Sequence, residues 1–219
     1  MGDAASPDQR VLTTVRRDDY QPTHGLFTRT GMSGSPYPVR MPAPPQRIAA
    51  HLLGDVGTRL PHTRAVARQA RMVSEFLEDR WKGATVDAAW LHDIGYGPTV
   101  SSSGFHPLDG ARWLRAEGFS KVTCSLVAWH TGAIYEARER GLEDELLAEF
   151  APPPPSALDA LTWADLTSSP SGDLVTPVVR LNEILDRYEP GSAVHRAIVA
   201  GWDDLQESAD RIEQLMEAL

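Results

Sequence analysis

An imidazole and a carboxylate that are adjacent in the chain, His92 and Asp93, lie in the apolar stretch AAWLHDIGY at residues 88–96. A buried charge needs a partner, and a metal ion is the commonest partner for this pair of side chains. Four further residues of the same types stand near the ends of other segments that have the pattern of a buried helical face: His62, His106, His130 and Asp165. The sequence therefore predicts a metal centre built from six side chains.

The types of side chain indicate the class of ion. Imidazole and carboxylate groups suit divalent first-row metals, and the set contains no thiolate that would favour a soft cluster. We expect iron or manganese, with zinc, cobalt or nickel as alternatives. The single cysteine, Cys124, lies in an apolar helical stretch and is expected to pack in the core.

Helical spacing predicts how the chain positions these side chains. Apolar residues recur every three or four positions in segments that we expect to be helices, at about 47–53, 62–79, 86–94, 121–130, 158–165, 173–188 and 192–219, with one more that begins at Phe105-His106-Pro107. Gly110 and Ala111 in that helix would let another helix approach closely. The last two helices carry ordinary amphipathic stripes and are expected to be structural. Because no alternating strand pattern stands out, we predict an all-α, bundle-like domain.

Length and composition restrict the organisation and the partners. The 219 residues, 42% of them hydrophobic, suit one main domain, which we place at 47–219. Residues 1–46 are rich in Pro, Gly and Ser without periodicity and are expected to form a flexible tail. With 30 acidic and 21 basic residues the formal charge is −9, which disfavours a nucleic-acid polymer but not a small phosphorylated substrate. No membrane span or secretory signal is visible, so we expect a soluble, cytoplasmic protein; the oligomeric state stays open.

The order His62, His92-Asp93 and Asp165 resembles the HD-domain superfamily of metal-dependent phosphohydrolases, over about residues 47–188. His106, in FHPLDGA, and His130, in WHTG, make the chain similar to the six-ligand, two-metal branch, which includes bacterial symmetrical diadenosine tetraphosphate hydrolases. The resemblance implies that the first four residues hold one ion and that Asp93 bridges to a second ion, held also by His106 and His130. It implies a hydrolase for a small phosphate ester, a nucleotide or a dinucleoside polyphosphate, with a metal-bridging hydroxide as the nucleophile and Asp93 as the central catalytic residue.

The sequence departs from one common form of the motif, in which a lysine follows the His-Asp-x-Gly string. Tyr96 stands in that place here, which weakens the transfer of cyclic-dinucleotide phosphodiesterase activity. As substrate-binding residues we predict Arg64, two residues past His62, Tyr96, and Ser102 in the serine loop beside His106. Asp109 is expected to have a structural role in its own helix.

Two other functions fit the same six residues. Some HD-domain proteins with the two-metal pattern are mixed-valence di-iron oxygenases that cleave carbon bonds, and the ligands alone do not separate them from hydrolases. A non-catalytic sensory module could also keep the metal and recruit a partner through the proline-rich tail. We rank the sensory module last because a complete ligand set would then be kept for structure alone.

Overall fold

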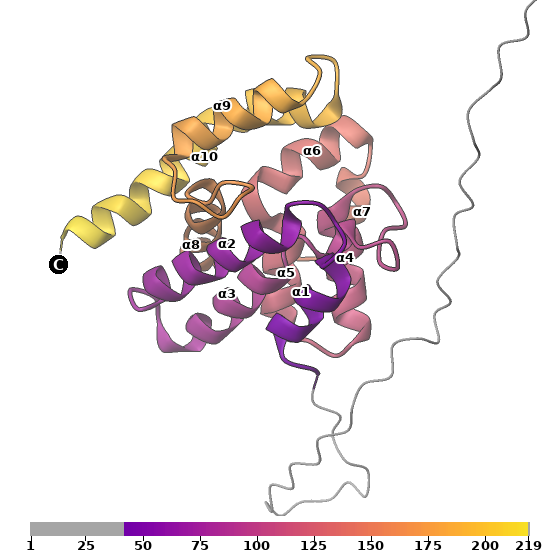
Figure 1. Cartoon of the computed structure of the whole chain (residues 1–219), viewed down its shortest axis with the longest axis horizontal. Coiled ribbons are helices and arrows are strands. Elements are labelled where there is room, and N and C mark those ends of the chain that lie inside the picture. The colour runs from indigo at the N-terminus through magenta and orange to yellow at the C-terminus, as the bar shows by residue number, and fades with distance from the viewer. Residues whose placement is uncertain (1–41, 219) are drawn as a thin grey trace, which may run out of the picture. The chain divides into compact units, whose positions relative to one another are not determined.

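This computed structural model describes residues 42–218, and its regular elements are all helical, as Figure 1 shows. In chain order they are α1 (Pro45–Leu53), α2 (Arg59–Ser74), α3 (Asp79–Leu91), the 3₁₀ turn η2 (Ile94–Tyr96), α4 (His106–Ala116), α5 (Lys121–Trp129), the 3₁₀ turn η3 (His130–Gly132), α6 (Ala133–Arg140), α7 (Glu143–Glu149), α8 (Pro155–Leu166), α9 (Pro177–Arg187) and α10 (Ala193–Glu217). Within 42–218 the sole β-pairing is an isolated bridge between Ser168 and Leu174. The predicted all-α fold class is confirmed, whereas most of the tail expected at 1–46 lies outside the described residues.

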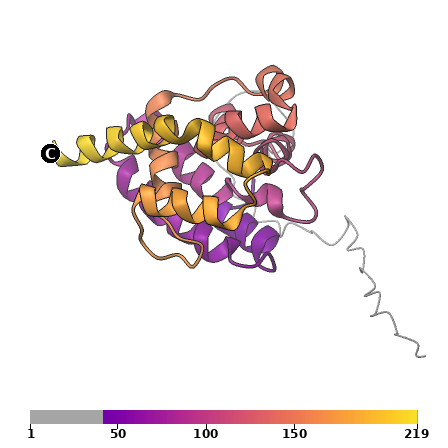
Figure 2. The ribbon, with the colours of Figure 1, turned by 90° about the horizontal axis from the view of Figure 1, so that it is seen from above.

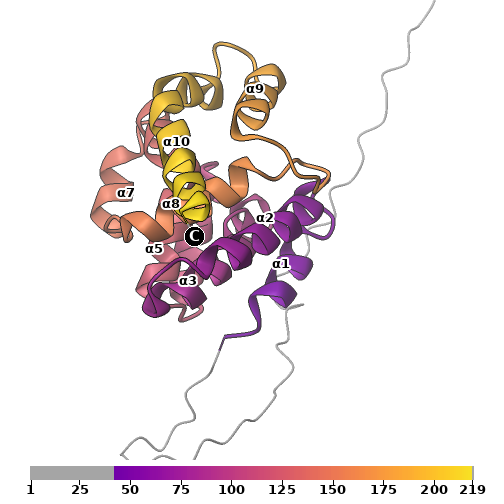
Figure 3. The ribbon, with the colours of Figure 1, turned by 90° about the vertical axis from the view of Figure 1, so that its left-hand side faces the viewer.

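The helices that carry the six predicted ligands pack against one another. α2 packs most closely against α3 and α8, and α4 packs against α5, while α10 runs along α6, α8 and α9. The pair α9 and α10 gathers at one end of the bundle, away from α1 and α3 (Figures 1 and 3). Figure 2, seen from above, shows α9 and α10 lying over the other helices. No helix within residues 42–218 combines the length and the apolar character needed to cross a bilayer.

Two hydrophobic clusters hold these layers together. The large cluster draws on most of the helices and includes the fully buried Phe105, Leu114 and Leu126. The small cluster consists of Leu166, Leu181, Ile198 and Leu205, with Ile184, Leu185, Val194 and Trp202 packed against it. Cys124 is buried in the large cluster, as predicted, and burial raises the pKa of its thiol to about 11. The small cluster joins α9 to α8 and α10, while Ala209 and Ile212 of α10 also belong to the large cluster.

Several helix boundaries differ from the prediction; α2, for example, runs from Arg59 to Ser74 rather than from 62 to 79. Three of the differences have identifiable reasons. α1 starts at Pro45, because a proline suits the first position of a helix. α3 starts at Asp79 rather than near 86, since its first turns, DRWKGA, carry charges that interrupt the apolar stripe. α9 starts at Pro177 rather than 173, because Thr176 caps it by accepting a hydrogen bond from the Val179 amide. The more polar stretch before Phe150 contains α6 and α7, each too short to show a clear stripe.

Candidate metal centre

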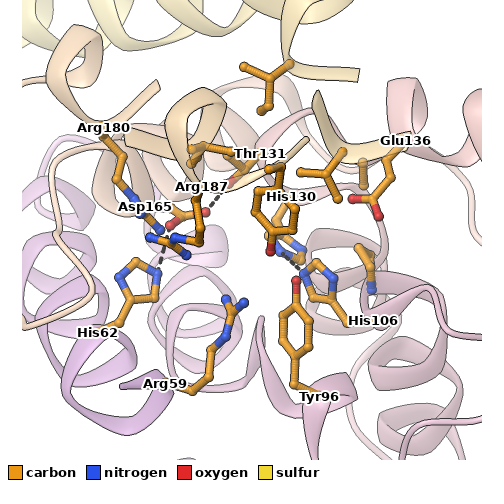
Figure 4. A pocket seen from close by; sticks show the side chains of 16 residues that line it. Arg59, His62, Tyr96, His106, His130, Thr131, Glu136, Asp165, Arg180 and Arg187 are labelled. Carbon is orange, nitrogen blue, oxygen red and sulfur yellow. Dashed lines mark hydrogen bonds and ion pairs between the residues drawn. The ribbon is translucent and has the colours of Figure 1, made fainter. Parts of the chain in front are cut away.

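The six side chains predicted as ligands lie together around one centre, part of which Figure 4 shows. One ligand atom from each of His62, His92 and Asp93 lies within 4.8 Å of the others, and the same holds for Asp93, His106 and His130. Asp93 belongs to both groups. Asp165 adjoins the first group, because its Oδ1 lies 3.0 Å from Nε2 of His62. The fold thus brings the six predicted residues to one place, arranged as two groups that share a carboxylate.

Each of these side chains lies at or next to the end of a helix. His62 lies in the first turn of α2, His92 directly follows α3, and His106 is the first residue of α4. His130 directly follows α5, and Asp165 is the last residue but one of α8. All six are buried except His106, whose side chain is 13% exposed. Five helices therefore converge on the centre through short, fixed side chains rather than through loops.

A glycine allows two of these helix ends to meet. A Cβ atom on Gly95 would lie 2.0 Å from the backbone oxygen of His106, a distance that real atoms do not reach. Gly110, one turn into α4, is also close, since a Cβ there would lie 3.3 Å from the Gly95 nitrogen. The close approach predicted at Gly110 is therefore made to the turn after His92-Asp93, and it sets the start of α4 beside the pair.

Backbone carbonyls fix the orientation of three imidazoles. Nδ1 of His92 lies 2.9 Å from the Ala89 oxygen, Nδ1 of His130 lies 2.6 Å from the Val127 oxygen, and Nδ1 of His62 lies 3.2 Å from the Ser169 oxygen. A carbonyl only accepts, so each Nδ1 carries the hydrogen and the Nε2 atoms are left to face the centre. Such contacts to the far nitrogen are typical of histidines that bind metals.

The donor set fits divalent ions. Nε2 of His92 is buried and has no hydrogen-bond partner, which is costly for a polar atom unless something else binds it. Nε2 of His106 and Nε2 of His130 lie 3.2 Å apart, and the Asp93 Oδ1 atom lies 3.6 Å from Nε2 of both His92 and His106. Converging nitrogen lone pairs around a carboxylate are what a first-row divalent cation binds. These His and Asp groups could therefore hold metal.

Burial and neighbouring charges shift the pKa values of the carboxyl and imidazole groups of the centre. Burial alone would raise the pKa of Asp93, but the charges of His92, Arg59 and His106 hold it far below its ordinary value. Burial opposes the charged form of Asp165 as well, yet its hydrogen bond with His62 lowers the Asp165 pKa and raises the His62 pKa. By contrast, burial and the neighbouring imidazole hold the pKa of His106 well below its usual value. Asp93 and Asp165 therefore favour the ionised form, whereas the His106 imidazole resists protonation.

Two neighbours of the centre were not predicted from the sequence. The Arg59 guanidinium donates to Oδ2 of Asp93 at 3.1 Å and lies over the ring of Tyr96, which in turn stacks on His106 with ring centroids 4.0 Å apart. The Thr131 hydroxyl donates to Oδ2 of Asp165. Signals for both exist: Arg59 precedes His62 by three residues and so shares its helix face, and Thr131 directly follows His130. Both hold a carboxylate in place.

Two predicted substrate-binding residues lie elsewhere. Arg64 is exposed on α2 and is not among the residues that line the cavity, because two positions along a helix turn a side chain about 200° away from His62. Ser102 does not line the cavity. Its amide and its hydroxyl both donate hydrogen bonds of 2.8 Å to the Asp109 carboxylate. Asp109 therefore ties the serine loop to α4, in line with its expected structural role. Of the three predicted residues, only Tyr96 lines the cavity.

A cavity that is open to solvent lies in front of the centre. Its inner face consists of His62, His106, His130 and Asp165, while His92 and Asp93 lie beneath them. Its outer wall comes from α9 and α10, contrary to the expectation that these helices are only structural: Arg180, Ile184, Arg187, Tyr188, Val194 and Ile198. Among residues 42–218 no serine, cysteine or lysine lines the cavity, and the Thr131 hydroxyl is bonded to Asp165.

Comparison with known proteins gives one match. The family described as HD domain matches residues 59–168, which are 110 of the 219 residues and include all six side chains of the centre. No curated protein and no solved structure matches the chain.

Proposed function

Because the chain belongs to the HD-domain family, we propose that it is a metal-dependent phosphohydrolase that acts on a small phosphate ester, a nucleotide or a dinucleoside polyphosphate. The observation that carries the proposal is the convergence of two three-residue groups on the shared carboxylate of Asp93, directly beneath a cavity. We propose His62, His92, Asp93 and Asp165 as ligands of one ion, and Asp93, His106 and His130 as ligands of a second. Iron or manganese suits this set best.

Bound divalent ions would supply an activated water near neutral pH and positive charge for phosphoryl oxygens. The residues of the chain have supporting tasks. Arg59 and Thr131 orient the Asp93 and Asp165 carboxylates, and the backbone carbonyls at Ala89 and Val127 keep imidazole nitrogens turned toward the centre. No serine, cysteine or lysine of the described residues lines the cavity and the Thr131 hydroxyl is bonded to Asp165, so we propose that water is the reactant. These features favour direct hydrolysis over a covalent phosphoenzyme.

The experiment that tests the proposal begins with metal analysis of the protein as purified. A panel of nucleoside mono- and polyphosphates and dinucleoside polyphosphates is then assayed for phosphate release with that metal restored. We expect Asp93→Ala to lower both the bound metal and the rate of hydrolysis by at least about 100-fold, since even the outer partners of metal ligands contribute 10- to 100-fold. Asp210→Ala, on the exposed side of α10, is the matched control and should leave both unchanged.

The same assays also distinguish the hydrolase from an oxygenase and from a sensory module. Full activity of Asp93→Ala, or no hydrolysis of any panel member by the metal-loaded protein, would reject the phosphohydrolase. Consumption of dioxygen that requires reduced iron would identify an oxygenase instead, and full activity with manganese without dioxygen would exclude one. Tight metal binding without any turnover would identify a sensory module.

A further inference from the structure

The outer wall of the cavity carries arginine and aliphatic side chains, unlike the inner face of histidines and a carboxylate. It is formed by α9 and α10, which follow the matched family region at 59–168. Two of its side chains are arginines, Arg180 and Arg187, and three are aliphatic, Ile184, Val194 and Ile198. Cations and apolar groups therefore alternate on one surface that faces the metal centre.

Arg180 is the unusual member of this wall. Its side chain is only 6% exposed, and its Nε atom is buried without a hydrogen-bond partner. A buried guanidinium normally uses all its donors, because each unpaired one loses its contact with water. One of its terminal nitrogens donates to Glu183, while the group itself lines the cavity, where Figure 4 shows it beside Asp165. The Nε donor of Arg180 is therefore unpaired, and its guanidinium group lies at the cavity in front of the centre.

A single carboxylate anchors both arginines from behind. Glu183 accepts from Arg180 with one oxygen and from Arg187 with the other, and it is not among the residues that line this cavity. Two guanidinium groups that share one carboxylate keep a net positive charge. Figure 4 shows Arg180, Arg187 and Arg59 directed at the same space in front of His62 and Asp165.

Three arginines line the cavity although the chain as a whole is acidic. The formal charge of the protein is −9, but the ionisable side chains that line the cavity outside the His and Asp cluster are three arginines, Glu136 and two tyrosines. Guanidinium groups match the oxygens of a phosphoryl group in geometry and charge. Arg180 and Arg187 share one carboxylate, so their side of the cavity has a surplus of positive charge, which indicates an anionic ligand.

The aliphatic side chains adjoin this cationic patch. Ile184 lies one turn after Arg180 on α9, and Val194 and Ile198 lie one turn apart on α10. All three belong to the small cluster or pack against it, so their cavity side is an extension of the core. An apolar or planar group attached to a phosphate could rest there while its phosphoryl oxygens contact the arginines.

We propose that α9 and α10 form the substrate-recognition wall, in which Arg180 and Arg187 bind phosphoryl oxygens and Ile184, Val194 and Ile198 contact the organic group of a nucleoside monophosphate. This inference deepens the proposed function and rests on it for the reaction, but ligand binding can be measured separately from turnover. The predicted specificity is for esters with an apolar or planar face, rather than for inorganic phosphate.

The test compares three probes by calorimetry on the full chain as purified: the phosphonate analogue of AMP with a CH₂ group in place of the ester oxygen, adenosine, and inorganic phosphate. We expect the analogue to bind most tightly. Arg180→Gln should weaken the analogue by at least about tenfold and leave adenosine unchanged, because only the phosphoryl contacts are lost. Ile184→Ala should weaken the analogue and adenosine but not inorganic phosphate.

Control variants show whether a loss of binding comes from the wall residues. Arg64→Gln removes an exposed arginine outside the cavity and should bind all probes as the wild type does. If circular dichroism shows that Arg180→Gln is unfolded, the partly exposed Arg187→Gln and the charge-preserving Arg180→Lys take its place, with a loss expected for the analogue alone. Wild-type affinity for the analogue in these arginine variants would overturn the inference. Arginine-dependent binding without hydrolysis would reject only the proposed function, and hydrolysis with arginine-independent binding would reject only the inference.

Discussion

The inner face and the outer wall of the cavity are built on different principles. The inner face consists of short side chains at helix ends, with imidazoles held by backbone carbonyls and helices held by the large cluster. The wall consists of long arginines of α9 that are bonded to one glutamate, and α9 joins α8 and α10 through the small cluster. The contrast indicates that the backbone fixes the geometry of the centre, whereas the proposed wall depends on long side chains and on the packing of α9.

The largest expected effect tests the backbone control of the inner face. Gly95→Ala places a methyl group 2.0 Å from the His106 carbonyl oxygen, so α4 must move away from the His92-Asp93 turn. We expect a loss of at least about 4 kcal/mol in the free energy of unfolding, at the upper end for single substitutions, together with loss of bound metal. Denaturant unfolding and metal analysis measure the two effects.

Gly83→Ala is the matched control for this change. Gly83 lies inside α3, and a Cβ atom there meets nothing within 4 Å. Alanine should stabilise the helix by about 0.5 to 1 kcal/mol. Equal stability of Gly95→Ala and Gly83→Ala would show that the approach of α4 to Gly95 does not position His106.

A second change tests whether the wall depends on its own cluster. Leu181→Ala on α9 removes a fully buried side chain from the small cluster, and we expect it to destabilise α9 by about 3 kcal/mol. Native-state hydrogen exchange should show faster exchange of α9 amides, with α2 and α3 little changed. Leu126→Ala, in the large cluster, should instead accelerate exchange throughout the described helices. The same exchange pattern for both variants would remove the distinction between the two regions.

A smaller effect concerns the strain at the inner face. Thr131 is the only non-glycine residue in the described range with a positive φ, of 45°, and its hydroxyl holds Asp165. Thr131→Val keeps the shape but loses the hydrogen bond, and it should cost about 1 to 2 kcal/mol of unfolding free energy. Thr131→Ser keeps the hydroxyl and should be near neutral. A serine variant as unstable as the valine variant would show that the methyl group, not the bond to Asp165, stabilises the turn.

The sequence predicted the all-α fold and the six residues of the centre because each stands at the end of an apolar stripe, where a helix must present it to the core. Their role as ligands stays a prediction. Arg180 and Arg187 could not be found in this way, since charged residues on an amphipathic helix such as α9 have the pattern of a solvent face. Their place over the cavity arises only when α9 packs against α8 and α10. Arg64 lies away from the cavity because two positions along a helix turn a side chain to a face different from that of His62.

The long helix α10 packs against α6, α8 and η3 as well as against α9, so a single element supports both His130 and the wall. Gly201 in its middle faces Tyr135, whose ring a Cβ atom would approach to 2.6 Å. An engineer who wished to change the proposed specificity could not exchange α10 without disturbing the surroundings of His130. Redesign would therefore be confined to the side chains of α9 that face the cavity, Arg180, Ile184 and Arg187.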